Sequence, residues 1–136
     1  MTVRILQGKL GIVAGVMLML VLLGSSCAPA NSPPVITSLT ASPPSVVMGS
    51  ACTIQCVASD PDGDPLQYTW HFGGGTLNGV EATTAVRSVS AGHTVTWEAK
   101  GTVGLITYVI DVTVEDGKGG TATANVNINV IEIGLQ

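Results

Sequence analysis

The sequence predicts an all-β sandwich of about seven short strands. In several segments apolar and polar residues alternate with a period of two, which is typical of strands with one buried face. Clusters of glycine, proline and aspartate separate these segments, and no segment has the apolar spacing of an amphipathic helix. Short strands of this kind pack as two sheets around a shared core, and ~100 residues suffice to form one.

The clearest alternation lies on either side of an acidic loop at residues 60–65. One face of the strand before the loop is formed by Cys52, Ile54, Cys56 and Ala58. One face of the strand after the loop is formed by Leu66, Tyr68, Trp70 and Phe72. We therefore expect core-forming strands over 51–59 and 66–72.

The remaining strands are expected before and after this pair. In chain order they cover 35–40, a short edge piece at 45–48, one near 84–89 within the less regular region 73–92, and then 93–99, 108–115 and 122–130. Pro43 and Pro44 interrupt the first of them, because proline cannot donate to a strand ladder. The glycine-rich turn 116–120 joins the last two strands as a hairpin.

Three aromatic side chains are expected to belong to the core. Trp70 and Trp97 are its bulkiest members. Tyr108 lies near the start of a late strand, where the hydroxyl of a tyrosine corner bonds back to the backbone.

The segment 1–26 is expected to be a signal peptide. Arg4 and Lys9 precede an apolar run over 10–24, which is shorter than the ~20 residues that span a membrane. A basic start, an apolar core and then small residues form the export pattern. We therefore expect the protein to act outside the cytoplasm.

Leu23-Gly24-Ser25-Ser26-Cys27 resembles the lipobox of bacterial lipoproteins, which implies cleavage before Cys27 and acylation of its thiol, for example with palmitate. The match is relaxed, because Gly24 occupies the place where that family prefers leucine. The alternatives are an ordinary signal peptide cut nearby, which leaves Cys27 unpaired, and a short uncleaved anchor. We expect an anchor and proline-rich tether over 27–34, a domain over 35–131 and a tail over 132–136, at the cell membrane or outer membrane.

The expected mature chain has few cations. Arg87, Lys100 and Lys118 stand against nine acidic residues, a formal net charge of −6. Cations that are this widely separated do not form the clustered basic patch that nucleic acid requires. We therefore expect no nucleic-acid partner. The expected partners are the membrane, through the lipid anchor, and a protein or surface polymer.

Three motifs carry a resemblance to a known family. They are ASDPDGDPLQYTWHFGGG at 58–75, VTWEA at 95–99 and YVIDVTVEDGKGG at 108–120. Through them the chain resembles an immunoglobulin-like domain of the polycystic-kidney-disease (PKD) type, common on bacterial surface proteins. The hallmark Trp-Asp-Phe-Gly-Asp-Gly is matched at Trp70, Phe72, Gly73 and Gly75, whereas His71 and Gly74 replace both aspartates. The resemblance implies an immunoglobulin-like sandwich with binding or spacing roles and no catalysis.

Adhesion, scaffolding or protein–protein interaction is the expected function of such a membrane-anchored domain. The alternative is a carbohydrate- or polymer-binding module, which exposed aromatic side chains would favour. A third hypothesis is self-association at an open sheet edge. The outward asparagines suited to that pairing are Asn125, Asn127 and Asn129.

Four aspartates are the candidate metal ligands. Asp60, Asp62 and Asp64 share one short loop, and Asp116 heads a later turn that a sandwich places at the same end. Hard oxygen ligands suit Ca²⁺, and the PKD resemblance implies calcium at that end, as in some domains of the type. The alternative is a solvated turn in which aspartate side chains cap local amides. Calcium is therefore the one candidate cofactor.

Other candidate chemistry is weaker. Cys52 and Cys56 lie ~13 Å apart on one strand, too far for a disulfide, so we expect buried apolar thiols. The alternative is a copper site that adds His71, His93 and Met48. Neither histidine has a serine or aspartate partner nearby in the sequence, and no nucleophile elbow or phosphate loop is present. We expect no enzymatic activity.

Overall fold

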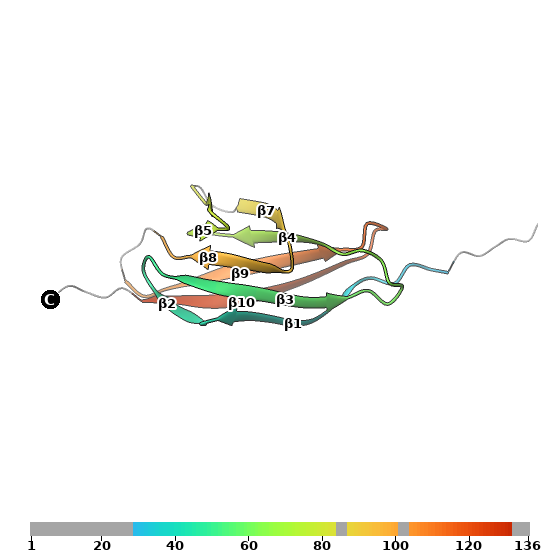
Figure 1. Cartoon of the computed structure of the whole chain (residues 1–136), viewed down its shortest axis with the longest axis horizontal. Coiled ribbons are helices and arrows are strands. Elements are labelled where there is room, and N and C mark those ends of the chain that lie inside the picture. Colours follow the sequence, from blue (N-terminus) through green and yellow to red (C-terminus); the bar gives the residue numbers. More distant parts are fainter. Residues whose placement is uncertain (1–28, 84–86, 101–103, 132–136) are drawn as a thin grey trace, which may run out of the picture.

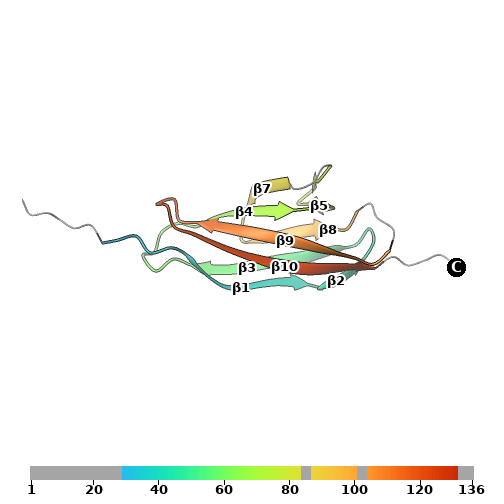
Figure 2. The ribbon, with the colours of Figure 1, turned by 180° about the vertical axis from the view of Figure 1, so that it is seen from behind.

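The protein folds as two five-stranded β-sheets, in a computed structural model that describes residues 29–83, 87–100 and 104–131 (Figure 1). Sheet A contains, in spatial order, β1 (Val35–Ser42), β3 (Ala51–Ser59), β8 (Thr94–Glu98), β5 (Thr76–Leu77) and β6 (Val80–Glu81). Sheet B contains β2 (Ser45–Val47), β10 (Thr121–Ile131), β9 (Ile106–Glu115), β4 (Gln67–Phe72) and β7 (Arg87–Ala91). Sheet A is in front in Figure 1, and sheet B is in front in Figure 2.

The predicted all-β sandwich is confirmed. The strand expected over 51–59 coincides with β3, and the other expected strands correspond to β1, β2, β4, β8, β9 and β10. The strand expected near 84–89 overlaps β7, and its first three positions lie outside the described residues. The signal peptide, Cys27 and the C-terminal tail also lie outside them. No helix among the described residues has the length and apolar character needed to cross a membrane.

The described residues form ten strands, where the alternation indicates about seven. β5 and β6 contain two residues each, which is too short for a period of two to become visible. β2 is separate from β1 because the chain moves from sheet A to sheet B between them. A cis peptide bond joins Ser42 to Pro43 at this crossing.

The N-terminal strands close one side of the sandwich. β1 pairs antiparallel with β3, whereas β2 pairs parallel with the end of β10. Backbone hydrogen bonds run from Met48 N–H to the Ile131 carbonyl (3.2 Å) and from Asn129 N–H to the Pro44 carbonyl (3.1 Å). β9 and β10 form the predicted hairpin, paired antiparallel along their length. The chain therefore contributes to both sheets before it enters β3.

The core lies between the sheets and centres on two tryptophans. Trp70 of β4 and Trp97 of β8 are both 0% exposed, as predicted. The Trp70 indole N–H donates to the Gly92 carbonyl (3.0 Å), and the Trp97 indole N–H donates to the Gly74 carbonyl (2.9 Å). Tyr108 is half-buried, with its ring centroid 5.1 Å from that of Trp97. The other large buried side chains are Ile54, Phe72, Leu77, Ile110 and Ile128.

Gly75 is packed against this core without room for a side chain. Its φ is +72°, and a Cβ would stand 2.5 Å from the Glu98 carbonyl oxygen and 2.8 Å from the Trp97 ring. We expect Gly75→Ala to lower the free energy of unfolding by about 3 kcal/mol or more, because left-handed backbone strain adds to overpacking. Urea unfolding of the full chain measures this loss.

Gly79 supplies the matched control. Its φ of +80° is similar, and a Cβ there would meet no atom within 4 Å. Gly79→Ala is therefore expected to lose about 1–2 kcal/mol from backbone strain alone. Equal losses in the two variants would contradict the tight contact between Gly75 and Trp97.

Candidate functional site

The loop between β3 and β4 gathers three carboxylates at one end of the sandwich. Oxygen atoms of Asp60, Asp62 and Asp64 lie within 4.8 Å of one another. Asp60 Oδ1 accepts hydrogen bonds from the backbone N–H groups of Asp62 (2.9 Å) and Asp64 (3.1 Å), which closes the loop on itself. The Oδ2 atoms of Asp60 and Asp64 are buried and have no hydrogen-bond partner. The loop therefore holds two buried anionic oxygens that its own turn does not use.

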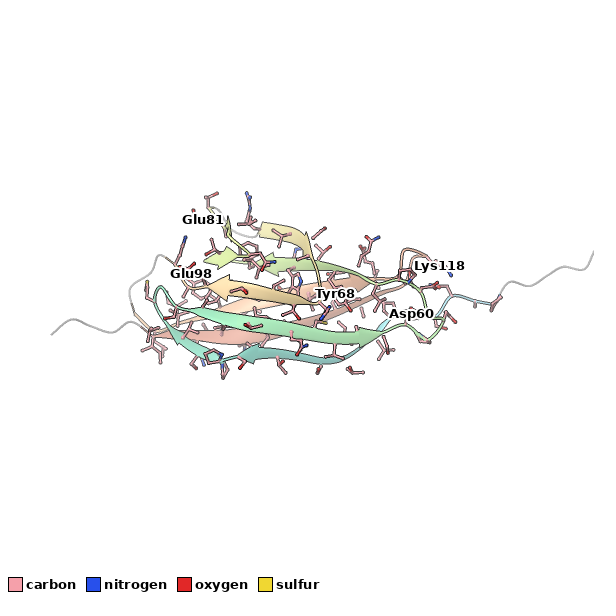
Figure 3. The ribbon with its side chains drawn as sticks, viewed as in Figure 1. Asp60, Tyr68, Glu81, Glu98 and Lys118 are labelled. Atoms are coloured by element: carbon pink, nitrogen blue, oxygen red, sulfur yellow. The ribbon has the colours of Figure 1, made fainter. Side chains whose placement is uncertain are left out.

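One cation from the β9–β10 turn faces this cluster. Lys118 Nζ lies 2.6 Å from Asp64 Oδ1, and Figure 3 shows Lys118 close to Asp60 at this end of the molecule. The hydrogen bond to Asp64, together with the charges of Asp64, Asp62 and Asp60, raises the pKa of Lys118. The ammonium group therefore already offsets part of the negative charge that the three carboxylates concentrate.

Asp116 has a different role from the three loop aspartates. It is 3% exposed, and its Oδ1 accepts hydrogen bonds from the backbone N–H groups of Lys118 (2.7 Å) and Gly120 (2.9 Å). Its Oδ2 accepts one from the Asn31 side-chain amide (2.7 Å). These hydrogen bonds, with that of Asn31 the strongest, hold the pKa of Asp116 below its usual value. Asp116 thus lies at the predicted end of the sandwich, but both its oxygens already accept hydrogen bonds, Oδ1 from the turn and Oδ2 from Asn31.

The chain that precedes β1 docks onto the same end. Besides the Asn31 contact, the backbone N–H of Ser32 donates to Asp62 Oδ2 (2.6 Å), and Pro34 is buried. The tether predicted up to residue 34 is therefore held against the domain from Asn31 onward. Single polar residues in a proline-rich stretch have no periodicity, so the sequence pattern does not reveal this docking.

Cys52 and Cys56 are buried on β3 as free thiols. Burial raises the pKa of both. Within the described part of the chain, Asp60, Asp62 and Asp64 are the one group of three or more His, Cys, Asp or Glu side chains close enough to share a metal ion. The structure therefore does not bring the cysteines together with His71 and His93 in the arrangement that copper would need.

A serine–histidine–aspartate row crosses the outer face of sheet B. Strand register places Ser88 of β7 and Asp111 of β9 on either side of His71 of β4, and Ser88 Oγ lies 2.5 Å from His71 Nδ1. Sequence reasoning missed this row because only strand register brings the three residues together. Ser88 and Asp111 are exposed, and neither hollow described below includes the row.

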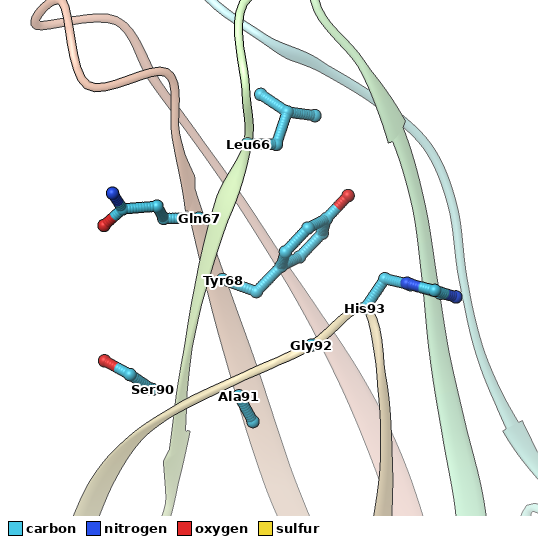
Figure 4. Close-up of a pocket in the computed structure, with 7 residues that line it drawn as sticks. All are labelled: Leu66, Gln67, Tyr68, Ser90, Ala91, Gly92 and His93. Atoms are coloured by element: carbon cyan, nitrogen blue, oxygen red, sulfur yellow. The ribbon is translucent and has the colours of Figure 1, made fainter.

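A hollow of about 550 Å³ lies at the edge of the sandwich, between β4 and the connection from β7 to β8 (Figure 4). Leu66, Gln67 and Tyr68 line it from the β4 side, Ser90 lines it from the end of β7, and His93 lines it from the connection. The Tyr68 and His93 rings meet edge to face, with centroids 6.3 Å apart and planes at 61°. Burial raises the pKa of the Tyr68 hydroxyl. The hollow therefore combines an aromatic surface with polar side chains.

A second hollow, of about 320 Å³, has a charged lining. The turn at 73–75 and the Tyr108 side chain form part of its wall. Lys100 and Glu81, which also line it, form an exposed ion pair of 2.9 Å. That hydrogen-bonded pair raises the pKa of Lys100 and lowers the pKa of Glu81.

Comparisons with known proteins agree with this fold. The family model described as the bacterial Ig domain matches residues 31–129, a range that begins at the docked Asn31. This match confirms the immunoglobulin-like domain predicted from the sequence. No curated protein matches the chain.

Several solved structures are similar to the chain. A nucleoside hydrolase-related hypothetical protein from Saccharophagus degradans, associated with carbohydrate metabolism, has 17% identity and a TM-score of 0.51. That match covers 76% of this chain and 26% of the other, so this chain spans about a quarter of that protein. The PKD1 domain of Vibrio anguillarum Epp has 23% identity and a TM-score of 0.45, with 76% and 100% coverage. The PKD domain of an M14-like peptidase from a Thermoplasmatales archaeon has 24% identity and a TM-score of 0.46, with 77% and 100% coverage. At 17% identity, the match to the Saccharophagus degradans protein shows a shared fold alone.

The hydrogen bonds of Asp116 predict a pH-dependent contribution to stability. We expect Asp116→Ala to lower Tm by roughly 4–8 °C at pH 7, because the backbone N–H groups of Lys118 and Gly120 lose their acceptor. Folding lowers the pKa of Asp116, so its contribution is complete above the usual aspartate pKa and is lost as the pH falls below it. The Tm difference between the two proteins should therefore stay constant from about pH 8 to 5 and shrink from about pH 5 to 2.

Asp111→Ala is the control, because Asp111 is exposed on a sheet face. Its Tm should remain close to that of the unaltered protein at every pH. A Tm difference for Asp116→Ala that persists unchanged down to pH 2 would show that the ionised form of Asp116 does not stabilise the turn.

Proposed function

This chain belongs to the bacterial Ig domain family, and we propose from that premise that a lipid on Cys27 holds its Ig-like domain outside the cytoplasm, where it acts in adhesion, scaffolding or protein–protein interaction. Domains of this family are typically extracellular or surface-exposed, and they are typically non-catalytic. These general properties favour binding to a partner over catalysis.

The docking of the chain before β1 is the observation that best supports an anchored domain. Cys27 precedes Asn31 by four residues, and an extended chain spans at most ~3.6 Å per residue. The acidic end of the sandwich would therefore lie within about 14 Å of an acylated Cys27. The 11 residues of β10 run from this end to the opposite one, so the far end would project ~35 Å further.

The outer faces of the two sheets suit contact with a partner. They present mainly hydroxyl and amide side chains. Exposed examples on sheet B are Thr107, Thr121, Thr123, Asn125, Asn127 and Asn129. Exposed examples on sheet A are Thr40, Ser42, Thr53, Gln55, Thr94 and Thr96. Such faces offer many hydrogen bonds and little charge, so shape and hydrogen bonding would decide which surface they recognise.

The lipid anchor is tested by mass spectrometry of the mature protein. We expect the N-terminal peptide to begin at Cys27 and to carry acyl chains, and we expect the protein in the membrane fraction. Cys27→Ser removes the acyl acceptor, so the variant should lack the lipid and lose its stable attachment.

Ser26→Ala is the matched control, because it keeps a small residue before the cysteine. This variant should be processed and acylated like the unaltered protein. A mature N-terminus elsewhere, or an unmodified Cys27, would contradict the anchor.

We also propose that the acidic loop binds Ca²⁺ through Asp60, Asp62 and Asp64. Three carboxylates within 4.8 Å suit an ion that takes six to eight oxygen ligands, and the unpartnered Oδ2 atoms of Asp60 and Asp64 support this fit. Lys118 competes with a cation for Asp64. Asp116, a candidate ligand on sequence grounds, would instead support the site by holding the turn that carries Lys118.

Calorimetric titration with CaCl₂ tests this site. We expect a Kd on the order of 10⁻⁴–10⁻³ M, as in extracellular modules, and a higher Tm in millimolar Ca²⁺. Lys118→Met should tighten binding because it removes the competing ammonium group, and Asp64→Asn should weaken it. Asp111→Asn, outside the cluster, should change neither. The absence of both heat and a Tm shift at millimolar Ca²⁺ would exclude the site.

A further inference from the structure

The hollow beside Tyr68 exists because the pairing of β7 with β4 stops one residue short of the N-terminal end of β4. The last paired residues are Tyr68 and Ala91, after which Gly92 and His93 carry the chain across to sheet A. β4 begins at Gln67, one residue beyond that last pair. A notch therefore opens at the edge of the sandwich, next to the first residue of β4 (Figure 4).

The crossing chain is held in place by two hydrogen bonds to buried groups. The Gly92 carbonyl accepts the indole N–H of Trp70 (3.0 Å), and the His93 carbonyl accepts the backbone N–H of Cys56 (2.8 Å). Trp70 and Cys56 are 0% and 1% exposed. The rim of the notch is therefore fixed by the core, and a preformed rim reduces the ordering cost of binding.

The lining of the notch combines an aromatic ring with an imidazole. Figure 4 shows the Tyr68 ring and the His93 side chain on one side of β4, whereas the side chains of Gln67 and Ser90 point to the opposite side, the outer face of sheet B. The Tyr68 hydroxyl and the His93 imidazole form no hydrogen bond with another residue in the described part of the chain. These groups are therefore available to a ligand.

The lack of a permanently charged side chain in this notch favours a neutral ligand over a charged one. Among the described residues, no lysine, arginine, aspartate or glutamate lines this notch, whereas Lys100 and Glu81 line the smaller hollow. A phosphate or carboxylate ligand would lose hydration without a fixed counter-charge to replace it. A sugar ring has apolar C–H faces that suit an aromatic surface and hydroxyls that suit phenol and imidazole groups. The volume of about 550 Å³ lies within the ordinary range of ligand sites.

We propose that this notch binds a neutral saccharide, with one sugar ring against Tyr68 and its hydroxyls bonded to the Tyr68 hydroxyl and the His93 imidazole. Both tryptophans are fully buried, so no tryptophan platform serves this purpose, and Tyr68 takes that role. The site is a more specific form of the proposed contact function. It rests on that function only because it names the class of surface polymer that the domain would contact. It is independent of the lipid on Cys27.

The test uses the full chain in a zwitterionic detergent that has no sugar head group. Calorimetric titrations with cellotetraose, chitotetraose and mannotetraose provide neutral probes, and trigalacturonate provides a charged one. We expect at least one neutral tetrasaccharide to bind and trigalacturonate not to bind. His93→Ala should weaken binding roughly tenfold, the effect of about 1.4 kcal/mol from a lost hydrogen bond, whereas Gln67→Ala, on the opposite face of β4, should leave binding unchanged.

Further variants separate ligand contact from unfolding. Gln67 and His93 are exposed, so their alanine variants should keep the Tm of the unaltered protein. Tyr68→Phe keeps the ring and should weaken binding less than Tyr68→Ala. Thr53→Ala, exposed on the outer face of sheet A, is the control and should bind as the unaltered protein does.

Three outcomes would overturn the proposal: no binding of any neutral tetrasaccharide, tighter binding of trigalacturonate, or binding unaffected by Tyr68→Ala and His93→Ala. Each would leave the acylation of Cys27 unchanged. Failure of the saccharide site is therefore distinguishable from failure of the anchored role.

Discussion

The structure depends on the burial of two indole rings whose N–H groups must still find acceptors. An unpaired N–H in this core would cost about 1–3 kcal/mol. Both acceptors are carbonyls in connections that cross from sheet B to sheet A: Gly74 after β4 and Gly92 after β7. Packing of the two tryptophans in the core therefore also fixes where the chain crosses between the sheets. The first crossing sets the β5–β6 hairpin on sheet A, and the second creates the notch beside Tyr68.

Electrostatics dominates the end of the sandwich that receives the chain before β1. Three segments far apart in sequence converge there: residues 31–34, the loop at 60–65 and the turn at 116–120. Asp116 and Asp62 attach the first segment, while Lys118 ties the turn to the loop. This end is thus held mainly by hydrogen bonds to carboxylates, and its stability responds to pH and cations far more than the apolar core does.

Much of the fold is predictable from the sequence because half-buried strands show a period of two. β3, β9 and β10 are long enough to display it, whereas the two residues each of β5 and β6 are not. The candidate site was harder to predict. Composition and turn position place the aspartates at one end, but whether Asp116 is free depends on where Asn31 docks. The Tyr68 notch and the row through His71 arise from strand register, which no local pattern encodes. Acylation of Cys27 stays a prediction.

The parallel pairing of β2 with β10 has a consequence for the protein under mechanical load. Asn31 and Ile131 lie at opposite ends of the sandwich, and β2 runs in the same direction as β10. Tension between these ends would pull the two strands past each other along their length. The hydrogen bonds that join Met48 to Ile131 and Asn129 to Pro44 would then bear the force together, as shear, and would not open one by one as a zipper does. The short strand β2, which closes one side of the fold, would thus also set the force at which the domain unfolds.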